Sequence, residues 1–305
     1  MVSVTLDTRM DLYTQVAQET ASQVIRRYST SFGLASRILD ASTRQHIDNI
    51  YSLVRLADEV VDGVATEAGV DLDTAGVLLD QLEAETERAM ASGYSTNLIV
   101  HAFSHTARQV GIEVELTRPF FHSMRMDLHQ TEHTPETFAD YVYGSAEVVG
   151  LMCLDVFLHG RPVSPEDKAT MVAGARALGA AFQKVNFLRD LRADFLALGR
   201  SYFPDVTPDS LDEATKHRLL DDIDNDLTHS AAALRLLPPA PRKAVALAHA
   251  LFDELGRRLR RTPASEVIAR RVRVPGAQKA WIATKIAFGW LPSAPKSPQK
   301  ETHHG

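Results

Sequence analysis

The chain has 305 residues, of which 45% are hydrophobic and 24% are charged, and its formal net charge is −6. This length is enough to bury a substantial core, and the composition is that of an ordinary globular protein. The negative charge argues against a general nucleic-acid binder, because affinity for the phosphate backbone requires a basic surface. The single cysteine, Cys153, excludes an intramolecular disulfide framework and fits a reducing compartment.

No targeting signal or membrane span is visible in the sequence. Residues 1–7 lack the basic and apolar regions of a signal peptide, and the most apolar internal run, 148–154, is far shorter than a bilayer span. We therefore expect a cytoplasmic protein, or one bound peripherally to the inner face of the cell membrane. Residues 292–305 are polar, contain three prolines and are expected to be disordered.

Apolar residues recur at helical spacing along most of the chain, and strand-like alternation is almost absent. Many of the breaks carry Gly, Pro or helix-capping residues. The pattern predicts one all-α domain over residues 1–291, a helical bundle around a central apolar cavity. The predicted helices are 12–27, 43–61, 73–91, 96–110, 116–129, 135–158, 165–198, 214–237, 241–259 and 277–289.

Two acidic clusters, about 130 residues apart, carry the functional signal. Asp58 and Asp62 are four residues apart, as are Asp190 and Asp194, and on a helix this spacing places each pair on one face. Like charges on one face repel each other unless a cation lies between them. Two such faces turned toward each other would form an oxygen-rich site for Mg²⁺, which in turn binds diphosphate oxygens. Either pair alone is typical of a solvated face, so the metal interpretation depends on both.

The helix predicted at 165–198 adds a polar stripe to the second cluster. Gln183 and Asn186 precede its two aspartates at steps of three and four, while small and apolar residues occupy much of the rest. Polar groups on an apolar helix need partners, which metal and phosphate would supply. An arginine accompanies each cluster, Arg55 before the first and Arg189 before the second.

A run of small residues at 173–181 precedes the stripe. It predicts close helix contact, room for a long hydrocarbon beside the metal site, or both. The pairs His101/His105 and His129/His133 have a spacing that could bind zinc, but no third ligand or general base accompanies them. We expect surface histidines there.

Seven arginines lie between residues 257 and 273, which reverses the charge of this acidic protein locally. A solvated basic face, contact with a second diphosphate and contact with anionic lipid headgroups are the three interpretations. The helix predicted at 277–289 is amphipathic, with Trp281 and Phe288 among its apolar residues. It would pack on the core or touch a membrane surface.

Several motifs, in order along the chain, resemble the squalene/phytoene synthase family, and within it the bacterial phytoene synthases. The resemblance extends over roughly residues 15 to 290. The motifs are YSTSF at 28–32, residues 51–62, MRMDL at 124–128, YVYGSA at 141–146, Gly150, residues 183–194 and GRSYFP at 199–204.

The resemblance implies an isoprenoid synthase fold and a prenyltransferase that joins two prenyl diphosphates head to head. Diphosphate leaves one substrate, the other attacks the allylic cation, and a cyclopropylcarbinyl diphosphate forms and then rearranges to a linear hydrocarbon. Three Mg²⁺ ions are expected, with Mn²⁺ as the alternative ion and no nicotinamide cofactor. The leading expectation is phytoene from two geranylgeranyl diphosphates, the first committed step of carotenoid biosynthesis.

The resemblance also assigns roles to residues. The expected metal ligands are Asp58, Glu59, Asp62, Asn186, Asp190 and Asp194. The expected substrate-binding residues are Ser31, Phe32, Arg55, Gln183, Asn186, Arg189 and Arg200. Tyr51, Arg55, Tyr141, Arg189 and Tyr202 are expected near the reaction centre, and the expected cavity walls are Phe32, Leu34, Val149, Phe182 and Phe187.

Two positions depart from the pattern of many relatives. Glu147 stands where glycine is common and would add a carboxylate to a helix that lines the cavity. His133 stands where tyrosine is common. Both departures leave the metal ligands in place but bear on the substrate register.

Three other functions compete with phytoene synthesis. A C30 squalene or dehydrosqualene synthase would use two farnesyl diphosphates instead. A non-catalytic helical scaffold that binds isoprenoids would be favoured by loss of a cluster aspartate, and all four are present. A chain-elongating prenyltransferase would carry adjacent aspartates, which neither cluster has.

Overall fold

The computed structural model describes residues 8–29, 31–62 and 64–292, with the side chains of Ser31 and Phe32 outside the described part. Within these ranges the chain is helical, and the only strand-like pairing is an isolated bridge between Glu132 and Ser201. The all-α prediction is confirmed. The predicted disordered tail lies outside the described residues, apart from Pro292.

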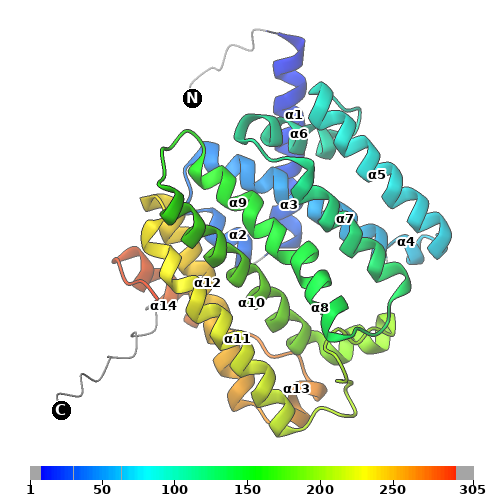
Figure 1. The fold of residues 1–305 in the computed structure, drawn as a ribbon, viewed down its shortest axis with the longest axis vertical. Helices are drawn as coiled ribbons and strands as arrows, with labels where there is room; N and C mark the ends of the chain where they lie inside the picture. Colours follow the sequence, from blue (N-terminus) through cyan, green and yellow to red (C-terminus); the bar gives the residue numbers. More distant parts are fainter. Residues whose placement is uncertain (1–7, 30, 63, 293–305) are drawn as a thin grey trace, which may run out of the picture.

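Figure 1 shows the helices as a bundle in which α10 runs through the middle. The helices predicted from periodicity are present, with ends shifted by a few residues and one interruption. Short helices that were not predicted are α2, α4 and α13. The helices are α1 (Arg9–Tyr28), α2 (Ser31–Ser36), α3 (Ala41–Val61), α4 (Val64–Glu67), α5 (Leu72–Ser92), α6 (Leu98–Val110), α7 (Val114–His129), α8 (Pro135–Val142), α9 (Val148–Leu158), α10 (Pro165–Leu198), α11 (Glu213–Ala233), α12 (Pro239–Arg261), α13 (Ala264–Ala269) and α14 (Gly276–Ala287).

The central helix α10 begins and ends where its sequence predicts. The Ser164 side chain accepts a hydrogen bond from the Asp167 backbone N–H, and Pro165 occupies the first turn, where no donor is lost. Gly199 ends the helix in the left-handed conformation with φ 67°. Between these caps α10 packs against α9, α11 and α12, so it contributes residues to the interior of the bundle on several sides.

The hydrophobic core has separate clusters on the two sides of this arrangement. One is built mainly by α1, α3, α5, α6 and α7, with Phe103, Phe120 and Phe121 fully buried. Another lies between α10, α11 and α12, around Leu188, Leu220 and Ile223. A cavity lined by residues of α3, α9, α10 and α12 lies in the same bundle and is described below.

The helix predicted at 135–158 is interrupted by a π-helical turn, Tyr143–Glu147, between α8 and α9. The turn has no room for a side chain at Gly144. A Cβ atom there would lie 2.1 Å from the Pro119 carbonyl oxygen and 2.2 Å from Ser123 Oγ. Single π-turns inside helices are frequent at functional sites, because they re-aim neighbouring side chains.

The segment Pro135–Leu158 is long and apolar enough, by length and composition alone, to cross a membrane. Its second half contributes Val148, Met152 and Val156 to the hydrophobic core. It also packs against α3, α7 and α10. We therefore interpret it as a core helix of the bundle.

The prediction of surface histidines is correct for His129 and wrong for His101 and His133. His101 is buried because its ring lies 4.8 Å from the Tyr13 ring and its Nε2 lies 3.0 Å from Thr14 Oγ1. His133 is buried against two tyrosines described below. Within the described residues no group of three or more His, Cys, Asp or Glu side chains is close enough to hold one ion.

Candidate active site

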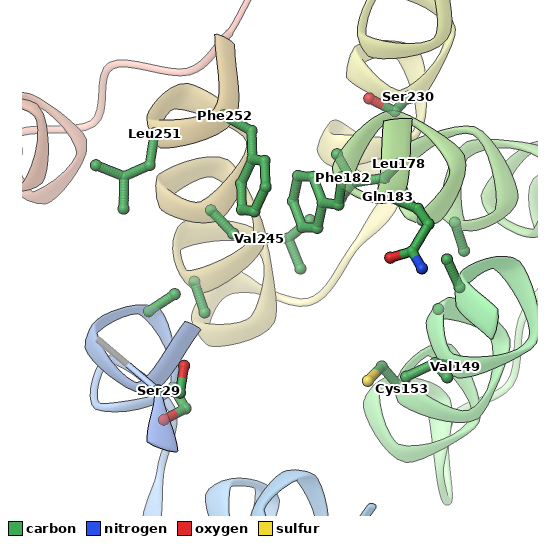
Figure 2. A pocket seen from close by; sticks show the side chains of 18 of the residues that line it. Ser29, Val149, Cys153, Leu178, Phe182, Gln183, Ser230, Val245, Leu251 and Phe252 are labelled. Carbon is green, nitrogen blue, oxygen red and sulfur yellow. The ribbon is translucent and has the colours of Figure 1, made fainter. Parts of the chain in front are cut away.

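A cavity of about 970 Å³ lies in the bundle, lined by residues of α1 to α3, α9 to α12, the π-turn and the segment 271–279. Figure 2 shows Val149 and Cys153 on one wall, and Phe182 on α10 facing Phe252 on α12. These two rings stack with centroids 3.8 Å apart. Burial raises the pKa of the Cys153 thiol to about 12, so this cysteine is an uncharged wall residue and not a nucleophile.

The interior of this cavity is apolar. Of the predicted wall residues, Val149 and Phe182 line it, whereas Leu34 and Phe187 do not. Phe187 instead stacks on Tyr202 with centroids 4.0 Å apart. The apolar lining comprises Leu39, Ile47, Val54, Val149, Leu154, Phe157, Met171, Leu178, Phe182, Leu234, Leu237, Val245, Leu251, Phe252 and Leu255.

The small-residue run of α10 serves both predicted purposes. Gly179 allows close helix contact, because a Cβ atom there would lie 2.6 Å from the Ala146 carbonyl oxygen. Gly174, Ala175 and Gly179 also line the cavity, where larger side chains would fill it. Both readings of this segment therefore hold.

One part of the cavity wall is polar, and it holds five of the predicted residues: Tyr51, Arg55, Gln183, Asn186 and Arg189. Gln183 donates from Nε2 to Ser145 Oγ in the π-turn, at 3.3 Å. Burial raises the pKa of the Tyr51 hydroxyl, which keeps it protonated. Two guanidinium groups and two amides thus border the cavity at this part, and the segment 271–279 also contributes Arg271, Arg273 and Lys279 to the lining.

The first acidic cluster lies at the end of α3, beside this polar wall. Arg55 pairs with Glu59 one turn along the helix. Burial and the neighbouring Asp62 carboxylate raise the pKa of Asp58 well above its usual value. Asp58 has no basic partner within ion-pair distance in the described ranges, so its buried charge is only partly compensated.

The second cluster lies on α10. Asp190 pairs with Arg189 and with Arg271, the latter at 2.9 Å from Nε. Burial, Asp190 and Asp62 together raise the pKa of Asp194 to about 7. Asp62, the C-cap residue of α3, contacts Arg200 just after α10 at 2.6 Å and helps to raise the pKa of Asp194 on α10. The ends of α3 and α10 that carry the two clusters therefore lie near each other.

Arg200 connects the two clusters to a buried polar network. Its Nη1 donates to Asp62 Oδ1 at 2.6 Å and its Nη2 donates to the Val61 carbonyl at 2.8 Å. The same Nη1 lies 3.4 Å from Asp127 Oδ1, and both arginine and aspartate are almost fully buried. The guanidinium therefore holds α3 and α7 together behind the acidic faces.

Asp127 was not among the predicted site residues, although it lies in the MRMDL motif. Tyr141 donates to its Oδ2 at 2.7 Å and Tyr202 to its Oδ1 at 3.3 Å. Burial raises the pKa of Asp127 to about 7, against the lowering effect of Arg200. An aspartate between Met126 and Leu128, inside the MRMDL motif, was the sequence signal for this residue.

Three predicted residues, Tyr141, Tyr202 and Arg200, therefore lie in this network and not on the cavity wall. The His133 ring packs beside both tyrosines, with centroids 5.1 Å and 6.0 Å away. Its substitution for the tyrosine of many relatives thus lies behind the cavity. The predicted roles of Ser31 and Phe32 fall on side chains outside the described part.

Glu147, the other departure, also points away from the substrate space. It pairs with Arg176 Nε at 2.6 Å and is absent from the cavity lining. The guanidinium of Arg176 in turn lies over the Tyr143 ring, 5.1 Å from its centroid. The carboxylate is thus added to a segment that lines the cavity, as expected, but its side chain is paired with Arg176 outside the cavity lining.

The facing clusters fit a divalent cation by their donor chemistry. All the donors are oxygens, and Asp58 and Asp194, one from each helix, are half-buried and have raised pKa values in part because other carboxylates are near. Mg²⁺ is usually held by one or two carboxylates together with substrate phosphates, so a preformed protein-only cage is not required. The residues present are compatible with the predicted metal site.

Comparison with known proteins shows the family of the chain. A sequence model of the squalene/phytoene synthase family matches residues 25–278. The chain belongs to this family. Phytoene synthase of Pseudescherichia vulneris is 29% identical over 77% of this chain and 80% of its own length, and that of Mycobacterium tuberculosis is 27% identical over 88% and 89%.

Solved structures of the family confirm the isoprenoid synthase fold. A crystal structure of a dehydrosqualene synthase in complex with ligand superposes with a TM-score of 0.76 at 22% sequence identity, covering 91% of this chain and 97% of that one. Members of the family are prenyltransferases, and so is this protein. Its substrates are prenyl diphosphates.

Proposed function

We propose that this member of the family condenses two geranylgeranyl diphosphates head to head to phytoene, the first committed step of carotenoid biosynthesis. One observation carries the proposal: the long apolar cavity is bordered at one part by Arg55, Arg189, Gln183 and Asn186, beside two facing acidic clusters. This division matches a substrate with a diphosphate head and a hydrocarbon tail. The choice of the C20 substrate is supported by the phytoene synthases among the relatives of this protein.

The diphosphate head of the substrate would be held by the arginines of the cavity wall and, through Mg²⁺, by the two acidic clusters. Arg55 and Arg189 would donate to diphosphate oxygens, since guanidinium groups bind them bidentately. Asp58, Asp62, Asp190 and Asp194, with Glu59 and Asn186, would hold Mg²⁺ against the same oxygens. Bound Mg²⁺ would neutralise the departing diphosphate and lower the barrier to its release.

The allylic cation left behind needs a dry enclosure, because water would capture it as an alcohol. The cavity walls supply this enclosure, and the faces of Phe182 and Phe252 can stabilise positive charge that passes them. Attack by the second substrate's double bond would give a new carbocation, and loss of a proton from it would close the ring of the cyclopropylcarbinyl diphosphate. A second ionisation, rearrangement and loss of a proton would then give phytoene, and we expect no nicotinamide cofactor in this sequence.

The decisive experiment incubates purified protein and Mg²⁺ with the C20 or the C15 diphosphate under identical conditions, with and without NADPH. We expect faster consumption of the C20 substrate and a C40 hydrocarbon that forms without NADPH. A preference for the C15 substrate would transfer the assignment to the C30 synthases, which the structural likeness to a dehydrosqualene synthase makes the second candidate. Binding of both diphosphates without any turnover would indicate a non-catalytic scaffold.

We further propose a peripheral contact with the inner face of the cell membrane. Helix α14 buries Ile282 and Ile286, while Trp281, Phe288 and Trp290 are 64%, 88% and 40% exposed. Aromatic side chains beside basic residues are typical of a membrane interface. A hydrocarbon product has almost no solubility in water, so transfer into a bilayer is physically favoured.

A further inference from the structure

A second, open pocket of about 280 Å³ lies outside the catalytic cavity, between the end of α12 and the segment after α13. Five arginines line it together with two other residues. This concentration of guanidinium groups is unusual for a protein with a net charge of −6. The lining residues are Arg258, Arg261, Thr262, Arg270, Arg271, Val272 and Arg273.

Three of these arginines are neutralised by carboxylates. Arg258 pairs with Glu254 at 2.9 Å, and Arg270 pairs with Glu266 at 2.5 Å. The third, Arg271, pairs with Asp190 of the second acidic cluster. The local acids therefore offset only part of the positive charge of the pocket.

The other two, Arg261 and Arg273, have no carboxylate within ion-pair distance in the part of the chain that the structure describes. Both are exposed, and both line the same small pocket. Converging guanidinium groups that lack a protein anion are suited to phosphate, because their fork of donors matches its oxygens.

The pocket also shares a wall with the catalytic cavity. Arg271, Val272 and Arg273 line both spaces, so one short segment separates them. An anion in the outer pocket would compete with Asp190 for Arg271.

We infer that this outer pocket is a second anion site that binds a diphosphate or phosphate-monoester group, apart from the site of catalysis. The inference rests on the proposed function only in that diphosphate is released next to this wall. Two sources share the chemistry: free diphosphate, and the phosphate of an anionic lipid headgroup. Arg261 and Arg273 provide the unpaired charge, and Thr262 adds a hydroxyl to the lining.

The test compares Arg261→Gln, which removes one unpaired arginine of the outer pocket and leaves the catalytic cavity lining intact, with a matched control. Arg257→Gln removes a charge from the same turn of α12, but Arg257 pairs with Asp253 and does not line the pocket. Lys279 lines the catalytic cavity and is therefore left unchanged in both variants. All these arginines are surface residues, and circular dichroism verifies that each variant is folded.

The free source is tested by calorimetric titration of inorganic pyrophosphate in EDTA at low salt. We expect the pocket variant to bind one pyrophosphate fewer per chain than Arg257→Gln, or to bind the outer one at least about tenfold more weakly, as the loss of charge-assisted hydrogen bonds predicts. The lipid source is tested by sedimentation with phosphatidylcholine vesicles that contain phosphatidic acid.

A defect of the pocket variant in the pyrophosphate titration assigns the site to free diphosphate. A defect with the vesicles alone assigns it to a headgroup, and the shared phosphate chemistry stands in both cases. Equal behaviour of the pocket variant and the control in both arms overturns the inference. Neither arm depends on turnover, so failure here is distinct from failure of the synthase proposal.

Discussion

Arg200 Nη1 lies 2.6 Å from Asp62 Oδ1, and this contact ties the loop after α10 to the end of α3. The same guanidinium neighbours Asp127, which in turn accepts hydrogen bonds from Tyr141 and Tyr202. The protein thus places its own buried cation behind the two acidic faces. The carboxylates are brought close together without a preformed cage of ligands, as a site completed by substrate oxygens requires.

Removal of a carboxylate from either cluster tests the metal site. Asp58→Asn or Asp190→Asn should lower hydrocarbon formation by at least about 100-fold, because electrostatic stabilisation of a departing anion is of that order. EDTA should abolish turnover in the parent protein. Asp80→Asn is the control, since Asp80 lies exposed on α5, where it pairs with Arg125 of α7. Full turnover in either cluster variant would contradict the role of these aspartates.

Loss of Arg200 should destabilise the fold as well as the site. Arg200→Gln leaves Asp127 buried without its cationic neighbour, and breaking such a pair costs about 3 kcal/mol of unfolding free energy. Urea denaturation measures the loss. The double variant with Asp127→Asn should recover part of it, because no buried charge then remains unpaired. If the two losses simply add, the two residues are not coupled.

The π-turn should be sensitive to one methyl group. Gly144→Ala forces a Cβ to within 2.1 Å of the Pro119 carbonyl oxygen, and the resulting overpacking should cost about 1–3 kcal/mol or more. Gly256→Ala on α12 is the matched control, because a Cβ atom there has nothing within 4 Å. That control should leave stability unchanged or raise it by about 0.5–1 kcal/mol. Thermal unfolding of both variants decides between these outcomes.

His249 should make the fold less stable in mild acid. Burial lowers the pKa of this histidine below 6.5, and its Nε2 lies 2.8 Å from the Leu227 carbonyl, while its Nδ1 has no hydrogen-bond partner among the described residues. The unfolded chain therefore takes up a proton that the folded chain resists, so the stabilisation is present above pH 6.5 and is lost as pH falls toward the folded pKa. Buried carboxylates such as Asp127 act in the opposite direction, so the comparison must be differential.

The measurement is the change in melting temperature of His249→Gln and of the parent between about pH 7.5 and pH 5.5. We expect acidification to lower the melting temperature of the variant by less than that of the parent, or to raise it by more. His129→Gln serves as the control, because His129 is exposed. Identical pH dependence in all three proteins would show that His249 does not contribute.

The membrane proposal predicts salt-sensitive binding to anionic vesicles. Trp281→Ser/Phe288→Ser should sediment less with vesicles than the parent, because both side chains are exposed and would enter the interface. Leu72→Ser is the control, a 54% exposed apolar residue at the start of α5. Binding by the parent should weaken with salt, since charges are screened beyond roughly 10 Å at 0.1 M. A parent protein that stays in the supernatant at low salt would exclude the contact.

Periodicity, caps and the spacing of aspartates determined much of this protein from the sequence alone. Helix α10 agrees with its prediction because Ser164, Pro165 and Gly199 are local signals that act within a few residues. The placement of each aspartate pair on one face of its helix was also predictable, because four-residue spacing depends only on helix geometry.

Only the tertiary structure decided which side chains reach the cavity. Tyr141, Tyr202 and Arg200 turn to Asp127, and Glu147 turns to Arg176, because each polar group satisfies its partner across helices that are distant in sequence. The close approach of α7 to the π-turn at Gly144 is likewise a tertiary contact that no local pattern records. Short-range signals determine helices and their faces, whereas pairing between buried charges depends on packing that brings distant segments together.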